Sequence, residues 1–152
     1  MRVSAKTDYA LRAMAELAAT PPGPVKGERL ASTQGIPLKF LENILTDLRR
    51  AGLVATQRGA EGGYRLARPA EEIALADVIR AVDGPLANVR GERPDTVEYT
   101  GAAEPLQDVW LAVRTNLRAV LETVTLADLA AGQLPADVAE LAATGKRAPS
   151  SA

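Results

Sequence analysis

The sequence predicts a mainly α-helical fold that carries one small β-hairpin. Apolar residues make up 47% of the 152 residues and aromatic residues only 3%. The core must therefore be built from Leu, Ala, Val and Ile, which at this chain length favours helices. Apolar residues recur at helical spacing in several segments, and one pair of short strand patterns flanks a glycine-rich turn.

The first two helices are expected near the N-terminus. Ser4 is a suitable N-cap residue, and apolar residues then recur at helical spacing as far as Ala18. The proline- and glycine-rich residues 21–24 end this helix, because proline removes a backbone donor and clashes with the preceding turn. A short second helix fits residues 26–33, and residues 34–36 form a tight turn.

A third helix and a hairpin are expected next. Pro37 opens the helix, where its missing N–H group costs nothing. The apolar stripe of this helix is Leu38, Leu41, Ile44, Leu45 and Leu48, and Gly52 lies just past its end. Residues 53–57 and 63–67 are strand patterns around a glycine-rich tip, which predicts a β-hairpin.

The second half of the chain is dominated by one long helix, expected from about Glu104 to Val124. A short helix at 75–82 precedes it, and residues 84–103 between them show little periodicity, which indicates a loop. The apolar residues of the long helix, at alternating steps of four and three, are Leu106, Trp110, Val113, Leu117, Val120 and Val124. This heptad seam predicts dimerisation. A capping box at 125–128 begins one more short helix that ends at Gly132.

Three helices followed by a two-stranded hairpin is the order of a winged helix-turn-helix domain. We therefore expect a DNA-binding domain at 1–83, a flexible or sensor loop at 84–103, a dimerisation segment at 104–132 and a C-terminal tail at 133–152. In this arrangement the third helix enters the major groove of double-stranded DNA. The third helix and the wing are therefore where DNA-contacting side chains are expected.

The polar side of the third helix supplies the candidates for base contact, which are Lys39, Glu42, Asn43 and Thr46. Lys39 can reach a phosphate or guanine, Glu42 can accept from the amino group of cytosine, and Asn43 can read adenine. Arg58 at the hairpin tip can enter a narrow minor groove. The candidates for phosphate contact are Arg2, Lys6, Arg49, Arg50, Arg65 and Arg68. The alternative reading is that these are ordinary solvated side chains.

Charge is distributed unevenly along the chain. Residues 1–68 hold 11 Lys or Arg and 6 Asp or Glu, a net charge of +5, whereas residues 69–152 hold 7 and 13, a net charge of −6. A basic half joined to an acidic half indicates a module that binds a polyanion, joined to a segment with another role.

Several function classes are excluded by what the sequence lacks. The chain has no cysteine and no histidine. Disulfides, thiolate catalysis, Ser-His-Asp triads and metal sites built on thiolate or imidazole are therefore ruled out, and we expect neither an enzyme nor a metal cofactor. No apolar run approaches the roughly 18 residues of a membrane span, and residues 1–10 lack the order of a signal peptide, so we expect a cytoplasmic protein without membrane contact.

Several segments together resemble the Rrf-type winged helix-turn-helix regulators, the family of IscR, NsrR, RirA and CymR. Residues 1–14 are similar to the family's opening and residues 35–42 to the start of its recognition helix. The similar segments that follow are 48–54, 58–59, 62–64, 73–83 and 110–129. The resemblance covers roughly residues 1–132 and implies a homodimer on a partly palindromic operator. It also implies that Glu42 reads a cytosine and that Arg58 enters the minor groove.

The chain departs from the family pattern at three places. Lys39 stands where relatives commonly have a small hydroxyl residue, and Ala60-Glu61 replaces the usual Pro-Gly of the wing. Many relatives hold an iron–sulfur cluster on cysteines in the region of residues 84–107, where this chain has none, and Glu104 and Gln107 stand near the last ligand positions. The chain therefore resembles a cysteine-less branch, whose signal comes from a small-molecule effector or a protein partner.

The expected function is a sequence-specific DNA-binding transcription regulator, a repressor that acts as a homodimer on a palindromic operator. The alternative is a protein-interaction module that uses the same fold to bind a metabolic enzyme or another partner. The salt dependence of DNA binding separates the two, because a protein held by phosphate contacts loses affinity steeply as salt rises.

Overall fold

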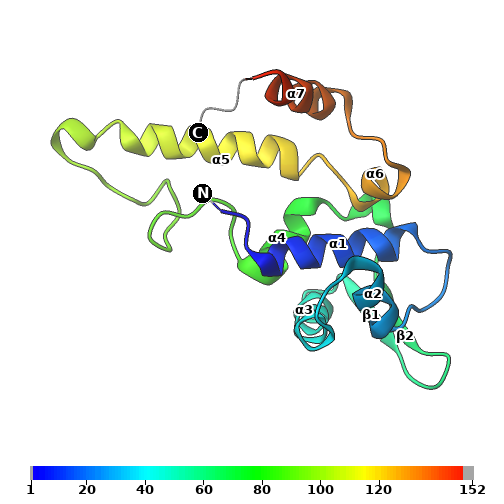
Figure 1. Cartoon of the computed structure of the whole chain (residues 1–152). Coiled ribbons are helices and arrows are strands. Elements are labelled where there is room, and N and C mark those ends of the chain that lie inside the picture. The colour runs from blue at the N-terminus through cyan, green and yellow to red at the C-terminus, as the bar shows by residue number, and fades with distance from the viewer. Residues whose placement is uncertain (1, 149–152) are drawn as a thin grey trace.

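The computed structural model describes residues 2–148 and confirms a mainly helical fold with one antiparallel hairpin (Figure 1). The first half contains α1 (Ala5–Ala19), α2 (Gly27–Gln34), α3 (Leu38–Arg50), β1 (Val54–Gln57), β2 (Gly63–Leu66), the 3-10 turn η1 (Ala70–Glu72) and α4 (Leu75–Asp83). The second half contains the 3-10 turn η2 (Gly101–Ala103), α5 (Leu106–Leu121), α6 (Leu126–Ala131) and α7 (Ala136–Arg147).

The core lies around α1, which packs against α2, α3, α4, α6 and β2. Leu41, Ile44, Leu45 and Leu48 of α3 are completely buried, as their spacing predicts. Leu38 was expected in the same stripe but is only half-buried, because it lies in the first turn of the helix, at the edge of the core. The fully buried stripe fixes which side of α3 faces outward.

Two predicted helix caps are confirmed. The Ser4 hydroxyl accepts a hydrogen bond from the Thr7 backbone N–H at 3.1 Å and so begins α1. Thr125 and Asp128 exchange side-chain and backbone hydrogen bonds of 3.2 and 2.9 Å at the start of α6. Such caps satisfy backbone donors that the first helical turn leaves without partners, and each is worth about 1 kcal/mol.

The long helix α5 differs from the rest of the fold because none of its residues is buried. It extends away from the helices around α1, and the loop of residues 84–103 returns along it (Figure 1). The helix is shorter than expected, since it ends at Leu121. Val124, predicted on the dimerisation seam, instead lies in the core, 2% exposed, where residues 124–126 hydrogen-bond with residues 73–75 in an antiparallel bridge.

The C-terminal segment also differs from the expected tail. Residues 136–147 form the helix α7, with Asp137 in its first turn and Lys146 and Arg147 in its last. A negative side chain at the N-terminal end and positive side chains at the C-terminal end interact favourably with the helix dipole and so stabilise the helix. The last residues of the expected tail, 149–152, lie outside the described part of the chain.

A carboxylate at the end of α4 ties that helix to the start of α1. Asp83 accepts hydrogen bonds from the hydroxyls of Ser4, at 2.7 Å, and Thr7. These two hydrogen bonds, with attraction from Lys6 as a smaller contribution, lower the pKa of Asp83 below its ordinary value of 3.8. The folded state therefore favours the carboxylate form of Asp83 more than the unfolded chain does.

We expect Asp83→Asn to lower the free energy of unfolding at neutral pH and to leave it almost unchanged in acid. A carboxyl whose pKa is lowered in the folded state stabilises that state above its unfolded pKa, and the effect is lost as the pH falls through the folded value. The two stability curves should therefore converge below about pH 4. Urea unfolding of both proteins across this range measures the difference, and parallel curves would contradict it.

Candidate nucleic-acid interface

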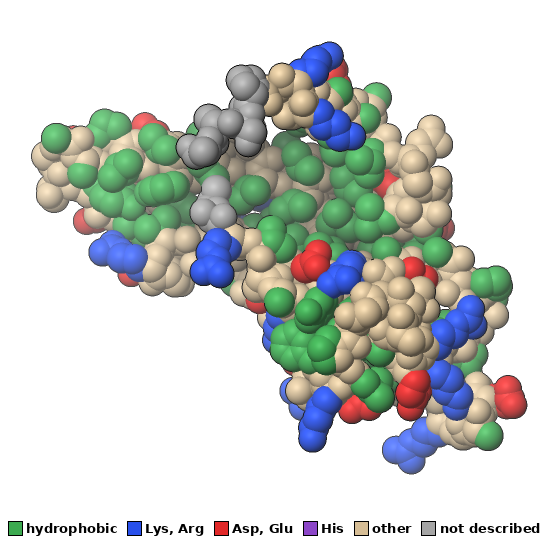
Figure 2. Space-filling model, viewed as in Figure 1, with side chains coloured by type: hydrophobic (Ala, Val, Ile, Leu, Met, Phe, Trp, Pro, Cys, Tyr) green, Lys and Arg blue, Asp and Glu red, His purple; other side chains and the backbone are tan. Residues whose placement is uncertain are grey.

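The outward side of α3 carries the side chains predicted to contact DNA. Lys39, Glu42 and Asn43 are exposed, opposite the buried stripe, and Arg49 is exposed in the last turn. Thr46 is half-buried, and its hydroxyl donates a hydrogen bond of 3.0 Å to the Glu42 carbonyl. Thr46 is thus less available for contact with a base than Lys39, Glu42 and Asn43. Figure 2 shows basic side chains projecting, with acidic ones among them, at the end of the molecule formed by α3 and the hairpin.

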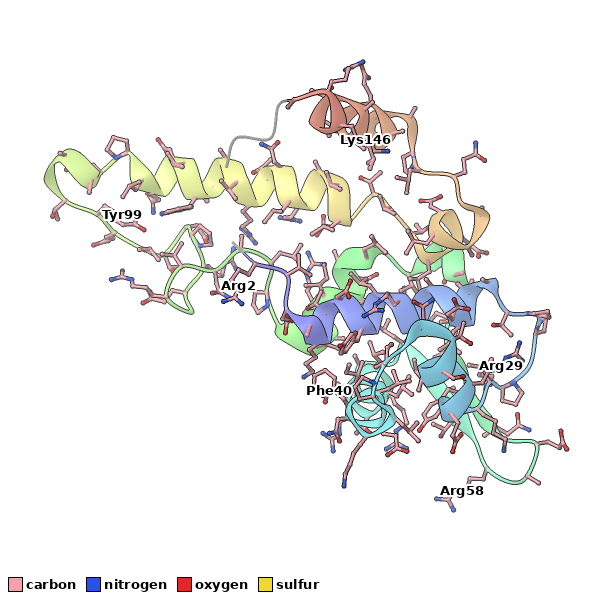
Figure 3. The ribbon with its side chains drawn as sticks, in the orientation of Figure 1. Arg2, Arg29, Phe40, Arg58, Tyr99 and Lys146 are labelled. Atoms are coloured by element: carbon pink, nitrogen blue, oxygen red, sulfur yellow. The ribbon has the colours of Figure 1, made fainter. Side chains whose placement is uncertain are left out.

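The two predicted phosphate contacts near the N-terminus lie in different surroundings. Lys6 forms an ion pair of 2.7 Å with Asp47 and so joins α1 to α3. The pair connects the two helices and leaves the Lys6 side chain only about one third exposed. Arg2 is exposed but, with Asp83 and Leu117, it lines a cavity between the N-terminus, α4 and α5, on the side of the molecule away from the wing (Figure 3).

The hairpin places Arg58 at its outer tip, where the side chain projects into solvent (Figure 3). Lys26, just before α2, donates a hydrogen bond of 2.7 Å to the carbonyl of Ala60. Val25 and Tyr64 exchange two backbone hydrogen bonds of 2.8 Å each. The segment before α2 therefore acts as a third strand beside β2, and it holds the wing against the helices.

Gly63 allows this close approach of the wing. A Cβ atom at this position would lie 2.4 Å from the carbonyl oxygen of Val25, and the residue has a φ of +153°. Glycine is the residue that adopts such a backbone conformation without steric cost and lets two backbones meet.

An aromatic contact at the start of α3 was not among the predicted site residues. Phe40 remains 39% exposed and meets the ring of Tyr9 edge to face, at 5.6 Å between centroids. The guanidinium of Arg12 lies 4.7 Å from the centre of the Tyr9 ring and also donates to the Gln34 carbonyl at the end of α2. Tyr9 and Arg12 thus brace the turn between α2 and α3, and Phe40 offers an apolar edge suited to a thymine methyl group.

Comparison with known proteins identifies the family to which this chain belongs. Residues 3–132 match the sequence profile of the family Rrf2, described as iron-dependent transcriptional regulator. The chain belongs to the Rrf2 family. It is 54% identical, over 93% of its length and 89% of the other, to a candidate HTH-type transcriptional regulator of Mycobacterium tuberculosis H37Rv, Rv1287. It is 36% identical to the HTH-type transcriptional regulator CymR of Bacillus subtilis, over 86% of this chain and 90% of CymR.

Solved structures of the family share the fold. The structure of CymR, described as the global cysteine regulator of B. subtilis, matches with a TM-score of 0.75 and 34% identity, over 88% of this chain and 99% of CymR. IscR of T. potens matches with a TM-score of 0.67 and 31% identity, over 98% of this chain and 93% of IscR. The chain is therefore a winged helix-turn-helix transcription regulator that binds DNA, and not an enzyme. No helix in residues 2–148 has the length and hydrophobicity to span a membrane.

The iron in the family description does not fit the donor atoms of this chain. Iron–sulfur clusters are held by cysteine thiolates, with histidine as the usual substitute, and the sequence has neither residue. Gln107, near an expected ligand position, instead donates a hydrogen bond of 3.0 Å to the Val97 carbonyl and so fastens the loop to α5. Among the described residues, no three carboxylates gather into a site that could hold a metal ion.

Proposed function

We propose that this Rrf2 protein is a repressor that binds a palindromic operator as a homodimer, in the cytoplasm where it meets the chromosome. The observation that carries the proposal is the combination of exposed Lys39, Glu42 and Asn43 on α3 with an apolar seam on α5 of which no residue is buried in the single chain. The first suits a DNA groove and the second suits another copy of the same helix.

The seam of α5 supports dimerisation. Leu106, Trp110, Val113, Leu117 and Val120 all remain half-buried or exposed in the single chain. Leu106 is 38% exposed, and its neighbour Val109 is 48% exposed. A continuous apolar stripe of this kind on a projecting helix is stabilised when a second copy covers it, and two-fold pairing would place two recognition helices on successive half-sites.

The face of α3 supports direct reading of bases. Glu42 and Asn43 can pair with the edges of cytosine and adenine in the major groove, and Lys39 with guanine or a phosphate. Arg58 stands far enough out on the wing to enter the adjacent minor groove. The division into a DNA-binding part at 1–83, a sensor loop at 84–103 and a dimerisation part at 104–132 remains part of the proposal.

The test is a titration of the purified protein onto the DNA upstream of its own gene, with a scrambled duplex of equal length as the control. Fluorescence anisotropy at several salt concentrations gives the affinity and its salt slope. We expect tight binding to the upstream DNA alone, weakened steeply by salt. Equal weak binding to both duplexes would contradict sequence-specific binding to that operator and would favour a role in protein contacts.

The variant Glu42→Ala should lose discrimination at one base pair of each half-site. A carboxylate that accepts from a cytosine amino group contributes about 1–3 kcal/mol to that choice. Glu28→Ala is the matched control, because Glu28 is equally exposed on α2 but lies outside the α3 face. Binding to a set of operators with each base exchanged measures the effect. An unchanged preference in Glu42→Ala would show that Glu42 is only a solvated side chain.

A further inference from the structure

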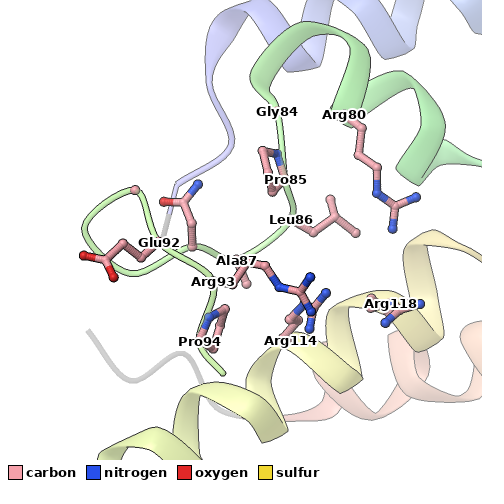
Figure 4. Close-up of a pocket in the computed structure, with 12 residues that line it drawn as sticks. Arg80, Gly84, Pro85, Leu86, Ala87, Glu92, Arg93, Pro94, Arg114 and Arg118 are labelled. Carbon is pink, nitrogen blue, oxygen red and sulfur yellow. The ribbon is translucent and has the colours of Figure 1, made fainter. Parts of the chain in front are cut away.

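Four arginines surround a cavity of about 440 Å³ between α4, α5 and the loop that joins them (Figure 4). Arg80 comes from α4, Arg93 from the loop, and Arg114 and Arg118 from α5. The loop also contributes apolar side chains, Pro85, Leu86 and Pro94. We call this cavity the arginine pocket. Its volume lies within the range of small-molecule binding sites in proteins, about 300–1,000 Å³.

Carboxylates around the pocket pair with three of the four guanidinium groups. Arg80 and Arg118 share the single carboxylate of Glu122. Arg93 makes a two-pronged pair with Asp95, with distances of 3.0 and 2.9 Å. Asp77 lies 3.9 Å from Arg80 as well, so these partners sit around the pocket, whereas Glu92 is the only carboxylate among the residues that line it beside the four arginines.

Of these four arginines, Arg114 is the one that forms no ion pair among residues 2–148, although Asp95 lies close enough to interact with its charge. The Arg114 side chain belongs to a half-buried residue, and among residues 2–148 it has no carboxylate within 4.0 Å. A half-buried guanidinium that forms no ion pair, with three other arginines nearby, attracts an anion that enters the pocket. Guanidinium groups bind carboxylate and phosphate in a two-pronged geometry.

The wall of the pocket is a loop in an unusual backbone conformation. Ala87 has a φ of +48°, which lies in the left-handed backbone region that residues other than glycine and asparagine rarely adopt. Such residues are found preferentially at ligand sites and switches. The side chain of Gln107 holds the far end of the same loop on α5.

We propose that the arginine pocket binds a small organic anion that carries a carboxylate or phosphate group. Arg114 is the main anchor for the oxyanion, Arg93 and Arg118 provide additional positive charge, and Pro85 and Leu86 face the apolar part of the ligand.

The pocket also lies at a joint between the two halves of the molecule. Glu122, near the end of α5, holds Arg80 of α4, and α4 packs on α1 beside the recognition helix. An anion that attracts Arg80 and Arg118 competes with Glu122 for them and so changes how α4 is held against α5. This regulatory consequence rests on the proposed function, whereas binding of the anion does not.

The test is isothermal titration calorimetry on the full chain with three probes, which are inorganic phosphate, succinate and glycerol 3-phosphate. The emission of Trp110, the only tryptophan, is a second readout, because Trp110 lies against Ala87, Asn88 and Pro94, which also line the arginine pocket. We expect saturable binding of at least one probe, with one site per chain. Comparison of succinate with the two phosphates shows which oxyanion the pocket prefers.

Three variants decide whether the binding belongs to this pocket. Arg114→Gln should weaken binding at least about tenfold, and Arg114→Lys less, because lysine keeps the charge but not the planar fork. Arg90→Gln is the matched control: Arg90 lies in the same loop and carries the same charge but does not line the pocket. Circular dichroism verifies that all three variants fold.

Two results would overturn the proposal. One is no saturable binding of any probe up to about 10 mM, a concentration that detects even millimolar affinity. The other is an equal loss of binding in Arg114→Gln and Arg90→Gln. Because these titrations contain no DNA, a failure of operator binding would leave their result intact, and the two proposals fail separately.

Discussion

Replacing Val113 and Leu117 together by Glu is expected to give a monomer that binds its operator at least about a hundredfold more weakly than the native chain. Both side chains lie on the apolar seam of α5, where two additional carboxylates would have to be buried next to the partner's copies. A monomer contacts one half-site and loses the gain from joining two weak contacts, which is commonly about 10²–10⁴-fold. Light scattering on a sizing column measures the mass.

The matched control for this variant is Ala112→Glu with Ala119→Glu. Ala112 and Ala119 are exposed on the same helix, away from the seam, and the variant adds the same two charges. We expect it to stay dimeric and to bind DNA with little change. A dimer that survives the Val113 and Leu117 exchange, or one that dissociates in both variants, would place the subunit interface elsewhere.

Gly63→Ala is expected to lower the free energy of unfolding by about 3 kcal/mol and to weaken DNA binding further by displacing the wing. The new methyl group would meet the Val25 carbonyl oxygen at 2.4 Å, and that oxygen belongs to backbone that is held by hydrogen bonds to Tyr64. The shifts that such overpacking forces typically cost about 1–3 kcal/mol of stability. The positive φ of an alanine at this position adds about 1 kcal/mol to that loss. Urea unfolding and operator binding measure the two effects.

Gly59→Ala separates the steric clash from the backbone strain. Gly59 has a φ of +102°, but a Cβ atom there would meet no other atom within 4 Å. This control should therefore lose only about 1 kcal/mol. Equal losses in the two variants would mean that the contact between Gly63 and Val25 does not hold the wing.

Local patterns predicted most of the first 83 residues, because each signal there acts within one helical turn or one hairpin. Ser4 and the α3 stripe depend on neighbours close in sequence, as does the capping box at Thr125 in the second half of the chain. Val124 was misplaced because it continues the heptad spacing beyond the end of α5. Only the bridge to residues 73–75, fifty residues away, removes it from the helix.

Long-range pairing also explains what was missed at the candidate interface and the C-terminus. No periodicity shows that Lys6 meets Asp47, or that Arg80 and Arg118 meet at Glu122, since each contact depends on how separate helices pack. The helix α7 could have been anticipated from the charges at its two ends, but its weak apolar stripe, with only Val138 buried, made it resemble a tail.

The strand-like pairing of Val25 with Tyr64 has a consequence for the DNA. This pairing and the contact of Lys26 with Ala60 join the wing to α2, and α2 packs on α3, so hydrogen bonds and packed helices connect the wing that carries Arg58 to α3. Under the proposed function, this connection limits how far the distance between the points where α3 and Arg58 enter the DNA can change. An operator with one extra base pair between those points would have to bend or twist to be bound, so the choice of sequence would extend to base pairs that no side chain touches.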